Sequence, residues 1–219
     1  MLLKKIQLKK FNRNQMIVLE GLPCAGKTTI AKWLSRELST IFIPELFDEK
    51  LKKDKRRINF YINDLIKGSN HLDDNIVIDR YFISTIAFEE TIKVLKKKRL
   101  ISEHNLGLYD FRNFHAKQLY AFLLKYSVIR QPNVVFYLKI SATDSIKRQY
   151  REKRGFSKLK DEFNIWQIPQ FLKEYQNFCL KNLKKYYSIN PIIININGRL
   201  TLSNIYTIIS YKLKQCKMV

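Results

Sequence analysis

The residues with the clearest chemical potential lie between Gly21 and Thr28, where the chain reads GLPCAGKT. The spacing GxxxxGK[ST] is typical of a phosphate-binding loop. Its two glycines let the backbone turn tightly and direct N–H groups at phosphate oxygens, and the helix that follows adds a positive N-terminal dipole. The pattern predicts that ATP binds through Gly21, Leu22, Pro23, Cys24, Ala25, Gly26, Lys27, Thr28 and Thr29.

Two side chains of this loop have separate predicted roles. Lys27, which we expect to be an exposed loop lysine, would reach the β and γ phosphates, and Thr28 would hold Mg²⁺ through its hydroxyl. Asp79 ends the apolar run NIVI, where a phosphate-loop protein often carries a carboxylate that acts on the metal or its waters. We therefore expect Thr28 and Asp79 to face the metal that accompanies ATP.

Arg80 follows Asp79 directly and is a candidate anion-binding residue. Its guanidinium can hold an anionic group at two points, which a lysine cannot do. The alternative is a buried Asp79–Arg80 pair at the start of a helix, with Asp79 as the helix cap.

Three arginines recur at every third position in the segment IKRQYREKRG, namely Arg148, Arg151 and Arg154. On a helix they would share one face and reach one ligand. Arginines placed in this way can stabilise the charge that develops on a phosphoryl group during transfer. The alternative is a solvated basic helix face, which a lysine-rich chain would also present.

The elements that must position these residues alternate along the chain. Apolar, β-branched runs predict strands at 15–20, 41–45, 75–79, 133–139 and 191–197. Helical periodicity predicts helices at 28–38, 84–97, 114–126, 142–153 and 169–186. This alternation indicates an α/β fold, a doubly wound parallel sheet of five strands with helices on both faces. Because ligands bind at the carboxyl ends of such strands, the phosphate loop and Asp79–Arg80 should meet there.

Composition limits the organisation and the partners. At 219 residues and 46% hydrophobic content, residues 1–219 are expected to form one domain that begins with a basic segment, 1–14. No apolar run approaches the roughly 20 residues of a membrane span, and the three cysteines have no ligand-like spacing, so we expect a cytoplasmic protein. The net charge of +22 is typical of a protein with an anionic partner, namely a nucleotide, a nucleic acid or a membrane surface. The alternative is that an A/T-rich genome supplies much of the lysine, because Lys, Ile, Asn, Tyr and Phe all have A/T-rich codons.

The segment DRYFISTIAFEE resembles the DRYxxSxxAY/F signature of thymidylate kinases and their relatives. The matching positions are Asp79, Arg80, Tyr81, Ser84, Ala87 and Phe88, and the order of motifs agrees from about residue 15 to residue 213. The resemblance implies a lid over about 148–165 that carries the three arginines. It also implies transfer of the γ-phosphate of ATP to a nucleoside monophosphate, dTMP to dTDP. Arg80 would contact the acceptor phosphate, and Ser84 and Phe88 would lie beside the acceptor.

The chain departs from that family at several positions. Pro23 stands where thymidylate kinases usually have an acidic residue, and Glu89 stands where they usually have a glutamine. The segment IPELFDE resembles the P-E element of deoxynucleoside kinases, in which the glutamate is the base toward a sugar hydroxyl, a role that would fall to Glu45. A deoxynucleoside kinase is therefore one alternative, and a nucleic-acid-binding phosphate-loop ATPase is another. The sequence leaves a homodimer open.

Overall fold

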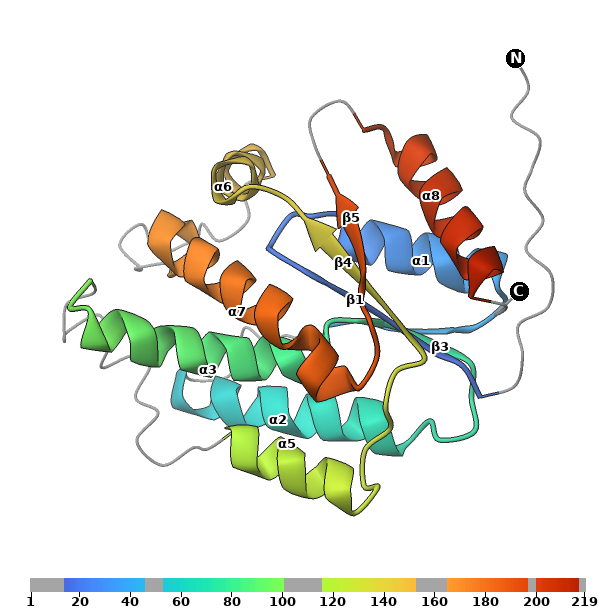
Figure 1. The fold of residues 1–219 in the computed structure, drawn as a ribbon, viewed down its shortest axis with the longest axis horizontal. Helices are drawn as coiled ribbons and strands as arrows, with labels where there is room; N and C mark the ends of the chain where they lie inside the picture. The colour runs from blue at the N-terminus through green and yellow to red at the C-terminus, as the bar shows by residue number, and fades with distance from the viewer. Residues whose placement is uncertain (1–13, 46–52, 101–115, 153–164, 197–199, 217–219) are drawn as a thin grey trace.

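The computed structural model describes residues 14–45, 53–100, 116–152, 165–196 and 200–216, with the backbone alone at 53–59 (Figure 1). Five parallel strands form a single sheet in the order β2-β3-β1-β4-β5. The strands are β1 (Met16–Gly21), β2 (Ile41–Ile43), β3 (Ile76–Asp79), β4 (Val134–Lys139) and β5 (Ile192–Asn195). All five expected strands are confirmed to within two residues at each end, and the predicted α/β class is correct.

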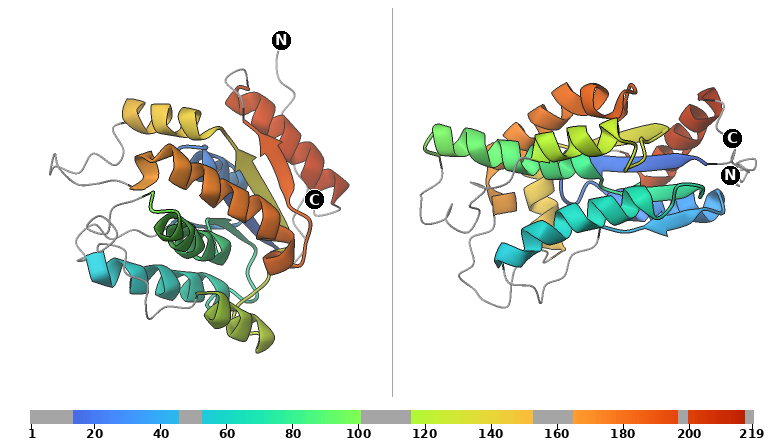
Figure 2. Two further views of the ribbon diagram at one scale, coloured as in Figure 1. Left: turned by 60° about the vertical axis from the view of Figure 1, so that its left-hand side comes forward. Right: turned by 90° about the horizontal axis from the view of Figure 1, so that it is seen from below.

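Helices cover both faces of this sheet. They are α1 (Lys27–Glu37), α2 (Lys53–Ser69), α3 (Phe82–Lys97), α5 (Ala116–Lys125), α6 (Ala142–Arg151), α7 (Pro169–Tyr187) and α8 (Leu202–Gln215), with a 3-10 turn at Ile165–Gln167. Helices α3 and α7 lie side by side in front of the sheet (Figures 1 and 2). Behind it lies α1, where Trp33 stacks on Tyr206 of α8 at 4.1 Å between ring centroids. None of the helices in the described part of the chain is long and apolar enough to cross a membrane.

Two of these helices, α2 and α8, are not among those predicted from the periodicity of the sequence. In the half of α2 whose side chains are described, the buried positions include the polar residues Asn63, Asp64 and Lys67 as well as Tyr61, while Ile62 and Ile66 are exposed. An ordinary amphipathic helix buries a mainly apolar stripe, so the buried polar groups of α2 need specific partners. Those of Lys67 lie at the carboxyl end of β3, and those of Asp64 lie on α3 and α5.

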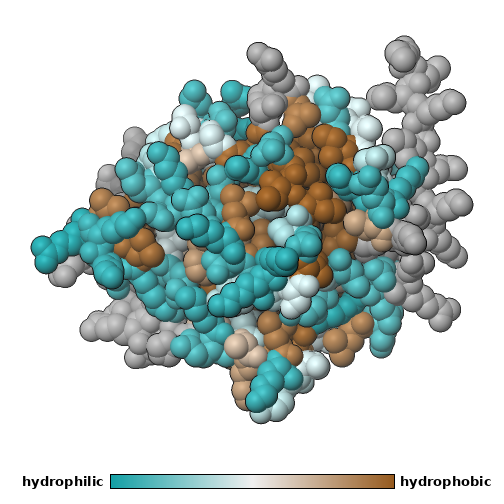
Figure 3. Space-filling view, in the orientation of Figure 1, coloured by the Kyte–Doolittle hydropathy of each residue, from teal (hydrophilic) through white to brown (hydrophobic). Residues whose placement is uncertain are grey.

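The three central strands are buried, as their continuous apolar sequences predict. Strands β1 and β3 are buried throughout, and β4 is buried except at Lys139. The edge strands β2 and β5 are only partly covered, so the expectation of two covered faces fails at the margins of the sheet. Apolar side chains gather on the surface at the β5 margin (Figure 3), where Ile193 and Leu202 are exposed.

The order of the strands brings the predicted motifs together. Strand β1 lies between β3 and β4, so the direction of winding reverses at β1. The phosphate loop follows β1, and Asp79 and Arg80 follow β3, in a register that pairs Leu19 with Asp79. Ligands bind in doubly wound folds at such a reversal, outside the carboxyl ends of the strands.

A substitution at Gly21, the last residue of β1, would test how closely the sheet packs against the start of the phosphate loop. Its φ is +141°, and a Cβ at this position would lie 2.4 Å from the carbonyl oxygen of Leu138 on β4. Gly21→Ala should therefore lower the free energy of unfolding by about 2–5 kcal/mol, through backbone strain and overpacking together. Gly26→Ala is the matched control, because Gly26 has a φ of +91° but open space around its Cβ position. Gly26→Ala should lower the free energy of unfolding by only about 1–2 kcal/mol. Urea unfolding of both variants would check the order, and equal losses would contradict the steric argument.

Candidate active site

The phosphate loop has the backbone conformation that its sequence predicts. Gly21, Cys24 and Gly26 all have positive φ angles, of 141°, 55° and 91°. Gly26 is the N-cap of α1 and, as a glycine, has no side-chain acceptor for a capping hydrogen bond, and the first turn of α1 contains no acidic residue. The first N–H groups of α1 thus point out of the helix with no side chain to compensate them, which is the geometry of an anion site.

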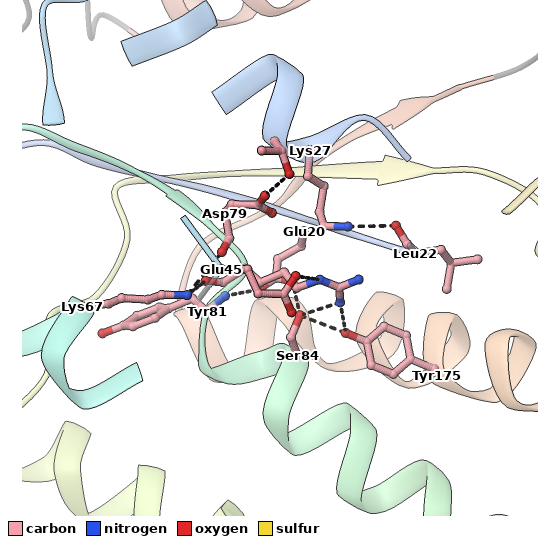
Figure 4. A network of polar contacts seen from close by, with 11 residues as sticks. Glu20, Leu22, Lys27, Glu45, Lys67, Asp79, Tyr81, Ser84 and Tyr175 are labelled. Carbon is pink, nitrogen blue, oxygen red and sulfur yellow. Dashed lines mark hydrogen bonds and ion pairs between the residues drawn. The ribbon is translucent and has the colours of Figure 1, made fainter. Parts of the chain in front are cut away.

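Lys27 is buried rather than exposed, so the sequence expectation on this point was wrong. Only 6% of its surface is accessible, and its Nζ donates a hydrogen bond to the carbonyl oxygen of Leu22 at 2.8 Å (Figure 4). Lys27 is the first residue of α1, and its side chain extends back to the loop carbonyl of Leu22. Burial lowers the pKa of Lys27 to about 8, and the charge of Arg80 lowers it as well. A bound polyphosphate would place negative charge beside this ammonium group and so favour its protonated form.

Thr28 and Asp79 are brought together as predicted. The Thr28 hydroxyl donates a hydrogen bond to Oδ2 of Asp79 (Figure 4). The other carboxylate oxygen, Oδ1, is buried without a hydrogen-bond partner in the described part of the chain. A hydroxyl and an incompletely satisfied carboxylate are hard oxygen ligands that fit Mg²⁺. The described residues contain no group of three or more His, Cys, Asp or Glu side chains arranged around a metal, so phosphate oxygens and water would complete such a site.

Arg80 occupies a left-handed backbone conformation, with φ of +60°, which is uncommon for a residue other than glycine. Its N–H donates to the carbonyl oxygen of Leu19 at 3.0 Å. The buried ammonium group of Lys67 donates to the carbonyl oxygens of both Asp79 and Arg80, at 3.3 and 3.0 Å. These contacts hold the turn, and they explain why α2 buries a lysine.

The Arg80 guanidinium is held on three sides. Its Nε lies 3.0 Å from Oε2 of Glu45, its Nη1 donates to the Tyr175 hydroxyl at 2.9 Å, and its Cζ lies 5.5 Å from the Trp166 ring centroid. Although burial lowers the pKa of Arg80, the charges of Glu45 and its other acidic neighbours raise it above the ordinary value. The alternative of a buried Asp79–Arg80 pair is wrong, because Asp79 is bonded to Thr28 and the N-cap of α3 is Tyr81.

Glu20 is a buried acid that the sequence interpretation missed. Its Oε1 accepts hydrogen bonds from the Tyr81 N–H at 3.0 Å and from the Tyr187 hydroxyl at 2.9 Å, and its Oε2 accepts from the Ser84 hydroxyl. Burial raises the pKa of Glu20 to about 7 in spite of these donors and the charge of Arg80. The available signal was an acidic residue inside the apolar strand MIVLEG.

Ser84 and Phe88, the predicted acceptor-binding residues of α3, lie in different surroundings. Ser84 is buried, and its hydroxyl is shared between Glu20 and Tyr175. Phe88 is half-buried and packs on Trp166 and on Phe171, both at 5.4 Å between ring centroids. Because the same Trp166 ring covers Arg80, Phe88 belongs to an aromatic cluster beside the guanidinium.

Glu89 faces away from this cluster. Its carboxylate accepts hydrogen bonds from the Tyr61 hydroxyl and from the N–H of Ala116, the first residue of α5, and it pairs with Lys93 at 2.7 Å. A carboxylate at a helix N-terminus is favourable for both hydrogen bonding and the helix dipole. The acid at this position therefore anchors α5 and does not face the acceptor side of α3.

Helix α6, the start of the predicted lid, is docked on the phosphate loop. The Ser145 hydroxyl donates to the carbonyl oxygen of Pro23 at 2.8 Å, and Arg148 Nη1 donates to that of Cys24 at 3.3 Å. Arg151 is exposed at the end of α6. Arg154 and most of the expected lid, 148–165, lie outside the described residues, so convergence of the three arginines stays a prediction.

The chain is similar in sequence and in fold to several named proteins. No protein-family model matches the chain. A probable thymidylate kinase from Picrophilus torridus is 25% identical over 209 residues, which cover 86% of this chain and 90% of the relative. A thymidylate kinase from Buchnera aphidicola is 23% identical over 215 residues, 85% of this chain and 88% of the relative. Among solved structures, thymidylate kinase from Candida albicans matches with a TM-score of 0.61 at 19% identity, over 94% of this chain and 93% of that one.

The chain is thymidylate kinase-like in sequence and in fold. The resemblance that the DRYFISTIAFEE segment indicates is thereby confirmed. The same fold occurs in deoxyadenosine kinase from M. mycoides with bound dATP, which matches with a TM-score of 0.61 at 19% identity, over 91% of this chain and all of that one. The thymidylate kinase-like fold is thus shared by enzymes with different acceptors, and the choice of acceptor must come from the site residues.

Lys27 offers a direct test of the phosphate loop. Lys27→Ala should lower kcat for nucleotide phosphorylation by about 10²-fold or more, because a charge that faces the transferring phosphoryl group is lost. Lys32→Ala is the matched control, since Lys32 is an exposed lysine on the same helix. A coupled assay for ADP would measure both variants, and circular dichroism would check that each is folded. Wild-type rates in Lys27→Ala would exclude the phosphate-loop assignment.

Glu20 should make stability depend on pH. Its folded-state pKa, about 7, lies above its ordinary value of 4.5, so the protonated form favours folding and that advantage disappears as pH rises through 7. Relative to Glu20→Gln, which cannot ionise, the wild type should lose about 3 kcal/mol of unfolding free energy between pH 4.5 and pH 8. Urea unfolding across this range would measure the difference, with Glu37→Gln on the exposed face of α1 as control. Parallel profiles for wild type and Glu20→Gln would contradict the prediction.

Proposed function

We propose that this protein is an ATP-dependent kinase that transfers the γ-phosphoryl group to a nucleoside monophosphate, as a thymidylate kinase converts dTMP to dTDP. The observation that carries the proposal is the buried Arg80 guanidinium. It follows the strand next to the phosphate loop and is oriented by Tyr175 and Trp166. A fixed guanidinium with five donors suits a phosphate group, which it can bind at two points.

The residues at the phosphate loop would bind ATP. The loop N–H groups and Lys27 would hold the triphosphate, and Arg148, which already contacts the loop at Cys24, would keep α6 against it. Thr28 and Asp79 would hold Mg²⁺, which neutralises charge on the β and γ phosphates when it is bound. Arg151 and Arg154 would add positive charge near the moving phosphoryl group.

On the acceptor side, Arg80 would bind the phosphate of the monophosphate, and the aromatic cluster with Phe88 and Trp166 would contact the base. The reaction needs no strong base on the protein, because the attacking phosphate oxygen is already ionised at neutral pH. The work of the acceptor residues is then to hold this oxygen in line with the γ-phosphorus and to exclude water. Whether two copies of the chain assemble stays a prediction that sedimentation would test.

One observation favours a second candidate, a deoxynucleoside kinase. Oε2 of Glu45 lies 3.0 Å from Nε of Arg80, and the Glu45 side chain is 41% exposed. A carboxylate held in this position could accept a proton from a sugar hydroxyl. The third candidate, a nucleic-acid-binding ATPase, has only the net charge of +22 in its favour.

Glu45→Gln separates the first two candidates. With a monophosphate acceptor the variant should keep kcat within about threefold of the wild type, because no proton has to be removed, and acceptor KM should not rise. With a nucleoside acceptor kcat should fall by about 10²-fold or more through the loss of the general base. Initial rates with dTMP and with thymidine, measured with labelled ATP, would distinguish the outcomes.

The control for this experiment is Glu174→Gln, which removes a half-buried carboxylate paired with Lys98 at the far end of α3. It should leave the rates with both acceptors unchanged. A near-complete loss of kcat with dTMP in Glu45→Gln, at normal KM, would overturn the monophosphate proposal.

A further inference from the structure

Glu20 does not belong to the phosphate loop or to the predicted acceptor residues, yet a chain of hydrogen bonds connects it to Arg80 (Figure 4). The series begins at Nη1 of Arg80, which donates to the Tyr175 hydroxyl at 2.9 Å and also, at 3.4 Å, directly to the Ser84 hydroxyl. Tyr175 donates to the Ser84 hydroxyl at 2.8 Å, and Ser84 donates to Oε2 of Glu20. All four groups are buried.

Every link of this chain points in one direction, away from Arg80 and toward the Glu20 carboxylate. A hydroxyl has a single proton, so each one that donates onward must receive from the preceding group through a lone pair. Arg80 can only donate. The lone pair that Tyr175 presents to Arg80 therefore requires Ser84 to receive the Tyr175 proton, and Ser84 can do so only while its own proton goes to an acceptor at Oε2.

A neutral side chain of the same shape would disturb that order. Glu20→Gln can keep an oxygen at the position of Oε1, where the Tyr81 N–H and the Tyr187 hydroxyl donate. Its NH₂ group would then occupy the position of Oε2 and would donate to Ser84 instead of accepting from it. Ser84 would donate to Tyr175, and the Tyr175 proton would be directed at Arg80, which has no lone pair to receive it.

We propose that Glu20 is a positioning residue that holds the Arg80 guanidinium in place through Ser84 and Tyr175. Its role for acceptor binding rests on the proposed function, but its effect on Arg80 does not. The Tyr187 hydroxyl provides the matched comparison. It bonds to the same carboxylate from the same helix as Tyr175, but through Oε1, on the branch that does not lead to Arg80.

The kinetic test compares Glu20→Gln, Tyr175→Phe and Tyr187→Phe. In Glu20→Gln and in Tyr175→Phe the KM for dTMP should rise about five- to tenfold, since an N–H of a buried charged group loses its acceptor, while the KM for ATP stays within about twofold. The double variant should raise the KM for dTMP no more than the larger of the two single-variant effects, because both changes break the same series of hydrogen bonds. Tyr187→Phe should leave the KM for dTMP unchanged. If Glu20→Gln does not fold, Ser84→Ala breaks the same chain at its middle and should behave as Tyr175→Phe does.

A second measurement needs no substrate. Side-chain ¹⁵N–¹H NMR of the arginines, with Arg80→Lys to identify the Arg80 signals, should show slowly exchanging guanidinium protons in the wild type and in Tyr187→Phe. Exchange should be faster in Glu20→Gln and in Tyr175→Phe. If the wild type phosphorylates no monophosphate, the proposed function fails, and the NMR comparison still decides the role of Glu20.

Three results would overturn the proposal. The first is an unchanged Arg80 spectrum in Glu20→Gln. The second is an equal rise of both KM values, which would indicate general loosening of the fold. The third is a KM for dTMP that rises in the double variant by the product of the factors for Glu20→Gln and Tyr175→Phe, which would show that the two residues act independently.

Discussion

The left-handed turn at Arg80 is the constraint on which the rest of the site depends. A non-glycine residue in this conformation costs on the order of 1–2 kcal/mol and persists only where its surroundings fix it. Here the Lys67 ammonium group bridges the carbonyl oxygens of Asp79 and Arg80, while Leu19 accepts the Arg80 N–H. The turn sends two consecutive side chains to opposite partners. Asp79 reaches Thr28 in the phosphate loop, and Arg80 reaches Tyr175 on α7.

The stabilisation of this turn extends into α2 through buried polar groups. Lys67 is only 3% exposed, and one of the buried acids whose charge it affects is Asp64: burial raises the pKa of Asp64, and the charge of Lys67 opposes that rise. Asp64 in turn accepts hydrogen bonds from the Thr85 and Tyr120 hydroxyls, at 2.7 and 2.6 Å. A buried ion that lost such partners would be strongly destabilising. The polar face of α2 is thus a support for the turn after β3.

The sheet and the phosphate loop could be predicted from the sequence because their signals are local. Apolar runs mark the strands, and the glycine spacing that ends at Lys27 specifies the loop. The parts that were missed depend on contacts between distant residues. Helix α2 buries polar and apolar residues together in its described half, Glu20 lies inside an apolar strand, and the burial of Lys27 comes with its contact to the Leu22 carbonyl. The Glu45–Arg80 pair joins residues from the ends of two different strands, which no local spacing reveals.

That pair also explains how one fold could serve two kinds of acceptor. Glu45 is 41% exposed, so its release from Arg80 into water costs little, whereas Arg80 is buried and needs a negative partner at all times. A monophosphate carries a charge of about −1.5 to −2 and three acceptor oxygens, so it would displace a single carboxylate from the guanidinium. A nucleoside carries no such charge and would leave the pair intact, with the Glu45 carboxylate held beside the sugar. The acceptor itself would therefore decide whether Arg80 binds a phosphate or orients a base.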